Sequence, residues 1–122
     1  MKSREESGRI RPLKIVFVIP VFNERPTLAD LAAGISEHAA EHEYEMLFVD
    51  DGSTDGSYEE LCRLAEEHAA MRVLKLRRNF GKTAALAAAF ARAEGDVVVT
   101  MDADLQDDPR EIPRLLAKLE EG

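Results

Sequence analysis

Two aspartates separated by one residue, Asp102 and Asp104, are the side chains in this sequence best suited to bind a metal ion. Carboxylate oxygens are the ligands that Mg²⁺ and Mn²⁺ prefer, and phosphate oxygens and waters commonly complete such sites. A D-x-D pair also arises often by chance, as two turn residues. Its place directly after the apolar run 97–101 (VVVTM), where a strand should end, favours a metal that bridges protein and diphosphate.

A second acidic pair, Asp50 and Asp51, ends another apolar run. An acidic residue at such a strand end commonly hydrogen-bonds a ribose hydroxyl or a base edge. The alternative is turn chemistry, with Asp55 or Ser57 capping the next helix. We predict a functional role for Asp51. The small residues after it are predicted to be structural: Gly52, Ser53 and Gly56.

Basic side chains follow a third apolar run. Lys82 would begin a helix, where a cation opposes the helix dipole, so a nearby ligand phosphate or the acidic cluster would explain it. Arg77 and Arg78 add positive charge at the same place in an acidic chain. The alternative for these arginines is a solvated surface pair.

The elements that must position these clusters alternate along the chain. Strands are predicted at 14–20, 45–50, 72–76 and 96–101, and helices at 28–41, from 57, at 83–93 and from 108. Such alternation predicts an α/β fold with a mainly parallel open sheet and flanking helices. The carboxyl ends of parallel strands meet at one edge, so all four clusters should lie on one rim.

Local signals place the helix starts. Thr27 with Asp30, and Ser57 with Glu60, predict capped first turns, and Asp108 is predicted to cap the last helix. Cys62 falls on the apolar face of the second helix and is predicted to be buried. A sheet of four strands would also leave an exposed edge, which a second copy or a partner chain could cover.

Composition excludes several classes of protein. The net charge of −8 argues against a nucleic-acid binder, and a single cysteine excludes an internal disulfide or a multi-cysteine zinc site. Neither a dinucleotide-binding G-x-G-x-x-G turn nor a P-loop is present. No apolar run reaches the ~18 residues of a membrane span. We predict a flexible tail at 1–12, one domain at 13–122, and a cytoplasmic protein.

Four ordered motifs together resemble family 2 glycosyltransferases: 18–24 (VIPVFNE), 49–57 (VDDGSTDGS), 78–82 (RNFGK) and 101–109 (MDADLQDDP). The subgroup that they resemble is the polyprenyl-phosphate sugar transferases, similar to dolichyl-phosphate mannose synthase. The resemblance implies the Rossmann-like nucleotide-binding half of a GT-A fold. It also implies inverting transfer from a nucleotide-diphosphate sugar with Mg²⁺ or Mn²⁺ as cofactor.

Site residues follow from the same resemblance. Asp102 and Asp104 would be the metal ligands, with Asp104 the chief one. The residues implied to bind the nucleotide sugar are Pro20, Phe22, Glu24, Val49, Asp51, Asp102, Ala103, Asp104 and Gln106. A looser role, toward phosphate or acceptor, is implied for Arg78, Asn79 and Lys82.

Family GT-A domains are considerably longer than this chain, and their general base is expected beyond Gly122. We therefore expect a donor site whose transfer activity alone is weak, acting on a polyprenyl phosphate at the cytoplasmic face of a membrane. A non-catalytic nucleotide-sugar-binding or assembly module that needs a partner chain is the alternative. A metal-dependent phosphohydrolase using Asp102 as nucleophile fits less well, since that class places its D-x-D after the first strand.

Overall fold

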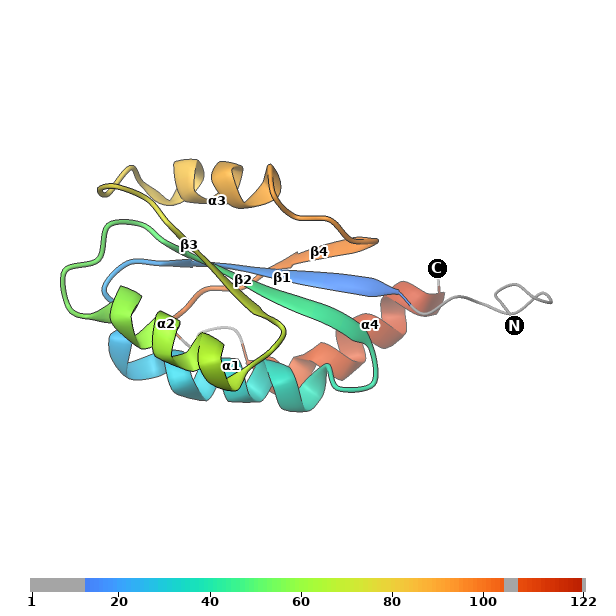
Figure 1. Ribbon diagram of the computed structural model, residues 1–122. Helices are drawn as coiled ribbons and strands as arrows, with labels where there is room; N and C mark the ends of the chain where they lie inside the picture. The colour runs from blue at the N-terminus through green and yellow to red at the C-terminus, as the bar shows by residue number, and fades with distance from the viewer. Residues whose placement is uncertain (1–12, 105–107, 122) are drawn as a thin grey trace.

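The computed structural model describes residues 13–104 and 108–121 of the chain (Figure 1). Strands and helices alternate as predicted. The strands are β1 (Lys14–Val21), β2 (Glu43–Asp50), β3 (Met71–Lys75) and β4 (Val97–Thr100). The helices are α1 (Arg25–His38), α2 (Ser57–Glu67), α3 (Lys82–Phe90), the short 3-10 helix η1 (Pro109–Glu111) and α4 (Ile112–Glu121).

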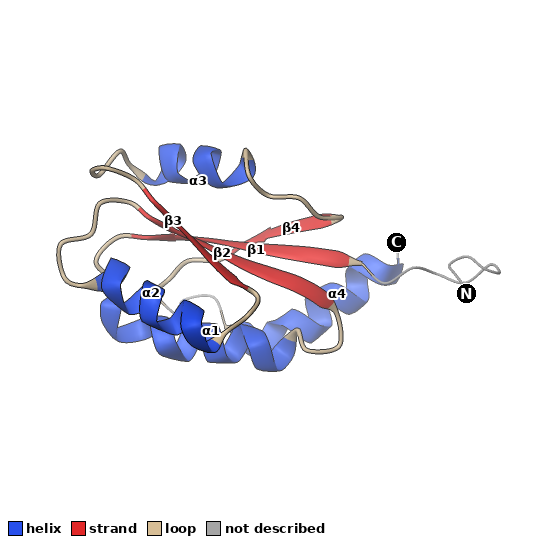
Figure 2. Cartoon of the chain, in the orientation of Figure 1, coloured by secondary structure: helices blue, strands red, loops and turns tan. Residues whose placement is uncertain are grey.

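The four strands form one parallel sheet in the order β3-β2-β1-β4. β1 and β2 pair along their whole length, from Lys14 opposite Glu43 to Val21 opposite Asp50. Helix α3 covers one face of the sheet, and α1, α2 and α4 cover the other (Figures 1 and 2). The predicted α/β class is confirmed, and the carboxyl ends of all four strands lie at one edge.

Both faces of the central strands are buried, which explains why β1 is almost continuously apolar. On one face, Phe17 and Phe48 pack with the apolar side chains of α1, α2 and α4. On the other face, Val16 and Val18 pack against Ala85 and Ala89 of α3. The small alanine side chains allow α3 to lie close to the sheet, and the two cores hold the strand ends at fixed relative positions.

Two predicted helix caps are wrong. α1 begins at Arg25, so Thr27 lies inside its first turn instead of capping it. α2 begins at Ser57 after Gly56, and the side chain of Asp55 accepts the Ser57 backbone N–H at 2.9 Å. The N-cap of α2 is Gly56, without a side-chain cap hydrogen bond, so neither Ser57 nor the alternative Asp55 is the cap of this helix. The cap predicted at the start of the last helical segment is confirmed, because Asp108 accepts the Arg110 backbone N–H at 2.9 Å.

The predicted burial of Cys62 is also wrong, because this residue is exposed. α2 buries Ser57, Leu61 and Leu64, a line of residues spaced by one turn, against the rest of the protein. Cys62 follows Leu61 by one residue and so lies about 100° around the helix, outside this buried line.

β4 is an edge strand in the order β3-β2-β1-β4, and no strand of the described residues pairs with its outer side. The strand alternates half-buried and exposed residues, and Val98 retains 42% of its accessible surface. The open edge agrees with the prediction for a sheet of four strands.

No helix in the described ranges is long and apolar enough to cross a membrane.

Candidate functional site

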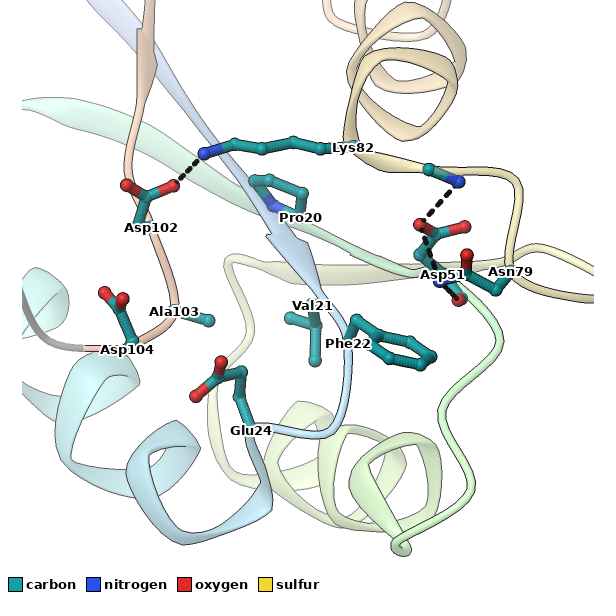
Figure 3. Close-up of a pocket in the computed structure, with 11 residues that line it drawn as sticks. Pro20, Val21, Phe22, Glu24, Asp51, Asn79, Lys82, Asp102, Ala103 and Asp104 are labelled. Carbon is teal, nitrogen blue, oxygen red and sulfur yellow. Dashed lines mark hydrogen bonds and ion pairs between the residues drawn. The ribbon is translucent and has the colours of Figure 1, made fainter.

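The segments after the four strands converge on a cavity of about 520 Å³ at the carboxyl edge of the sheet (Figure 3). Each strand contributes through the loop that follows it. The lining residues are Pro20, Val21, Phe22, Glu24, Asp51, Asn79, Gly81, Lys82, Asp102, Ala103 and Asp104. The convergence predicted from strand order alone is therefore what the fold produces.

Most of the predicted site residues line this cavity. Val49 does not, because its side chain is fully buried in the core beneath α3. Arg78 is not among the lining residues either, and its guanidinium lies 4.8 Å from the centre of the Phe80 ring. Gln106 falls outside the described residues. Sequence reasoning missed two lining residues, Val21 and Gly81; the clue to Gly81 was its place between two predicted site residues.

At the end of β2, Asp51 is buried and holds the loop that leads into α3. Its carboxylate accepts the backbone N–H groups of Phe80 at 2.8 Å and Gly81 at 3.0 Å. The side-chain amide of Asn79 also donates to this carboxylate, at 3.3 Å, and to the Asp51 carbonyl at 3.1 Å. Asp51 is therefore an anchor for the segment that carries Lys82 (Figure 3).

Gly52 explains how this loop comes so close. Its φ is +78°, a conformation that side-chain-bearing residues rarely adopt. A Cβ at this position would lie 2.3 Å from the backbone nitrogen of Asn79 and 2.5 Å from the carbonyl carbon of Arg78. The structural role predicted for Gly52 follows directly from this contact.

At the end of β1, the turn at Asn23 is tied to the turn after β2. Asn23 has a φ of +56°, its N–H donates to Ser53 Oγ at 2.9 Å, and its side-chain oxygen accepts the Thr54 N–H at 2.8 Å. The Glu24 N–H donates to Ser57 Oγ at 3.1 Å. These bonds hold the Glu24 side chain at the cavity.

The raised pKa of Glu24 reflects its burial and the other carboxylates near it. Burial raises the pKa of Glu24 above its ordinary value of 4.5, and the negative charges of Asp104, Asp55 and Asp102 raise it further. The carboxylates of Glu24 and Asp104 face the same open side of the cavity (Figure 3). A cation bound there would relieve this repulsion.

At the end of β4, the D-x-D segment is less enclosed. The side chain of Asp102 retains 39% of its accessible surface, and its carboxylate lies 2.5 Å from the Lys82 ammonium. Ala103 is buried, and its carbonyl accepts a hydrogen bond from the Thr27 hydroxyl in the first turn of α1. Asp104 is exposed at the cavity. Thr27 thus fixes the backbone between the two aspartates.

The chemistry of these donors fits a divalent cation that is shared with phosphate. In the described parts of the chain, no cluster of three histidine, cysteine or acidic side chains forms a complete metal cage. Mg²⁺ usually binds through one or two carboxylates, keeps several waters, and takes phosphate oxygens from the substrate. Asp102 and Asp104 could supply the two carboxylates of such a site, which a bound diphosphate would complete.

Comparison with known proteins agrees with this geometry. The sequence profile of the family described as glycosyl transferase family 2 matches residues 16–122. A relative from Pseudomonas savastanoi pv. phaseolicola, an undecaprenyl-phosphate 4-deoxy-4-formamido-L-arabinose transferase, is 48% identical over 116 residues, covering 91% of this chain and 34% of the relative. A relative of the same name from Proteus mirabilis is 44% identical, covering 89% of this chain and 34% of its own length. The chain thus spans about a third of these relatives.

Solved structures share the fold. A mannosyltransferase from Pyrobaculum calidifontis in complex with GDP-Man and Mn²⁺ has a TM-score of 0.74 and 29% identity, over 83% of this chain and 30% of that one. Glucosyl-3-phosphoglycerate synthase from Mycobacterium tuberculosis in complex with UDP has a TM-score of 0.71 and 29% identity, over 90% of this chain and 41% of that one. These neighbours confirm the predicted GT-A relationship. The fold, the ordered motifs and the profile match agree: this chain belongs to glycosyl transferase family 2.

Proposed function

We propose that this chain binds the donor of a glycosyl transfer, a nucleotide-diphosphate sugar, through a divalent metal held by Asp102 and Asp104. The observation that carries the proposal is the cavity on which the segments after all four strands converge. Support comes from the M. tuberculosis neighbour, which is described in complex with Mn²⁺, UDP and glucosyl-3-phosphoglycerate, and from the P. calidifontis neighbour with GDP-Man and Mn²⁺.

Different residues of the cavity would bind different parts of the nucleotide-diphosphate sugar. Phe22 and Asn79 lie near the buried Asp51, where a base and ribose would fit, and the D-x-D segment lies across the cavity (Figure 3). The metal would supply Lewis-acid stabilisation of the negative charge on the leaving nucleotide diphosphate. Lys82 would add a second positive charge beside the same phosphates.

The acceptor in this proposal is a polyprenyl phosphate at a membrane surface, since the relatives from Pseudomonas and Proteus are named for transfer to undecaprenyl phosphate. In an inverting transfer, an acceptor phosphate oxygen forms a bond to the anomeric carbon as the bond to the nucleotide diphosphate breaks. A phosphate acceptor is already ionised, so its attack needs less help from a general base than a hydroxyl would.

Calorimetric titration tests the donor part. UDP and GDP are added separately to the chain with Mn²⁺, with chelator, and to Asp104→Asn. Binding of one nucleotide that requires Mn²⁺ and is lost in the variant supports the proposal. A folded wild-type chain that binds neither nucleotide would rule it out for this chain.

A second candidate, a non-catalytic nucleotide-sugar-binding module that works with a partner chain or a second copy, is favoured by the outer edge of β4, with which no described strand pairs. Incubating the chain with radiolabelled nucleotide sugar, undecaprenyl phosphate and Mn²⁺ separates the two. Labelled lipid product supports the transferase, whereas donor binding without product supports the binding module.

A further inference from the structure

The most unusual contact in the cavity joins a lysine to a predicted metal ligand. Lys82 is the first residue of α3, and its ammonium lies 2.5 Å from a carboxylate oxygen of Asp102 (Figure 3). The two side chains come from the segments after β3 and β4, twenty residues apart in the sequence. Both are partly solvated, at 61% and 39% of their accessible surface, so the contact is not locked by burial.

Negative charge exceeds positive charge among the described side chains that line the cavity. Four lining residues are carboxylates, whereas Lys82 is the one basic side chain among the described lining residues. The negative charge of Asp51 is already stabilised by two backbone N–H groups and the Asn79 amide. The three other lining carboxylates outnumber the one lining ammonium, that of Lys82, so a further cation should bind before or together with an anionic diphosphate.

We propose that Lys82 is the resident counter-ion of Asp102, that a divalent metal displaces it, and that its ammonium then turns to the donor diphosphate. This inference rests on the proposed donor function. A divalent ion and an ammonium on the same carboxylate repel each other, so binding of the metal favours release of the lysine. Lys82 can leave at small cost, because an exposed ion pair contributes little stability and its four-carbon stem is flexible.

The position of Lys82 favours the second half of the exchange. A cation at a helix N-terminus is disfavoured by the helix dipole unless an anion lies beside it. In the structure that anion is Asp102. After the exchange, it would be a phosphate, the ligand for which a helix N-terminus is suited. The lysine would therefore weaken binding of the metal alone and strengthen binding of the metal–nucleotide complex.

The test measures both affinities on Lys82→Gln, Lys82→Arg and the wild-type chain. Free Mn²⁺ is followed by electron paramagnetic resonance without nucleotide, and UDP or GDP binding is followed by calorimetry at saturating Mn²⁺. Lys118→Gln is the matched control, because it removes the same charge from an exposed site in α4 that does not line the cavity. Thermal melts establish that each variant is folded.

We expect Lys82→Gln to bind Mn²⁺ alone about three- to tenfold more tightly than wild type, and the nucleotide at saturating Mn²⁺ about three- to tenfold more weakly. Lys82→Arg and Lys118→Gln should retain wild-type Mn²⁺ affinity. Unchanged or weaker Mn²⁺ binding by folded Lys82→Gln would overturn the exchange. Failure of the wild-type chain to bind any nucleotide would instead remove the proposed donor function, which the Mn²⁺ titration alone does not test.

Discussion

Two pairs of aspartates stand at the same edge of the sheet, and the protein uses them in opposite ways. Asp50 and Asp51, at the end of β2, are 0% and 3% exposed, and the Asp51 carboxylate accepts hydrogen bonds from three protein N–H groups. After β4, the Asp102 side chain is 39% exposed and forms an ion pair with the flexible side chain of Lys82. Asp51 thus holds the loop before α3, whereas Asp102 and Asp104 line the cavity with more exposed side chains.

The difference follows from the places of the strands in the sheet. β2 is a central strand, and the loop after its neighbour β3 folds across its end at Gly52. β4 is an edge strand, so only the β1 side of its carboxyl end is covered within the described ranges. The covered strand end lets backbone and amide N–H groups stabilise the buried Asp51 carboxylate, whereas the carboxylates after β4 stay more exposed.

The largest loss of stability is expected where the loop after β3 contacts Gly52 at the end of β2. Gly52→Ala should destabilise the fold by about 4 kcal/mol, because it adds backbone strain to a direct clash with the backbone of Arg78 and Asn79. Gly81→Ala is the matched control: its φ is +99°, but a Cβ there would meet nothing within 4 Å. Chemical denaturation should show a clearly smaller loss for Gly81→Ala, and equal losses would contradict the contact.

The next largest difference in stability is expected between a variant of Asp51 and the same substitution at Asp104. Asp51→Asn should cost about 2 kcal/mol of stability, because an amide cannot accept all the hydrogen bonds that the carboxylate accepts. Asp104→Asn, at an exposed position, should change stability by less than about 0.5 kcal/mol. Urea unfolding of both variants measures the contrast, and a large loss for Asp104→Asn would erase it.

A smaller effect is expected from the contact that positions the D-x-D segment. Thr27→Val keeps the shape of the side chain but removes the hydroxyl that donates to the Ala103 carbonyl, and should cost about 1 kcal/mol. Mn²⁺ affinity should fall with it, since the backbone between the two aspartates loses its support. Thr27→Ser retains the hydroxyl and should restore both values. If Thr27→Ser behaved like Thr27→Val, the hydroxyl would not be the cause.

The smallest effect is a dependence of stability on pH. The pKa of Glu24 is raised by burial and by neighbouring carboxylates, so its protonation favours the folded state. That contribution is present below the ordinary value of 4.5 and is lost as pH rises through the raised value. Glu24→Gln should therefore melt at a higher temperature than wild type at pH 7, with the advantage disappearing below about pH 4.5. A difference in melting temperature between Glu24→Gln and wild type that stayed the same from about pH 4.5 to about pH 7 would contradict a raised pKa of Glu24.

Sequence patterns predicted the elements and the convergence of their ends because both follow from local periodicity and from the geometry of parallel strands. They did not predict what each aspartate contacts, since that depends on how close one loop comes to another. Thr27 was predicted as a cap, yet its hydroxyl reaches the Ala103 carbonyl, 76 residues away. Cys62 was misplaced for a related reason: a helix face can be read from spacing, but its rotation is set by the packed protein.

We propose that a divalent metal binds at Asp102 and Asp104 and not at the covered pair, Asp50 and Asp51. Amide chemical-shift mapping by NMR during a Mg²⁺ titration tests this directly, with Asp104→Asn as control. We predict that the largest shifts fall on residues 101–104 and Glu24, and that they vanish in the variant. Shifts centred on Asp51 and Phe80, or a wild-type response that Asp104→Asn leaves unchanged, would contradict the account.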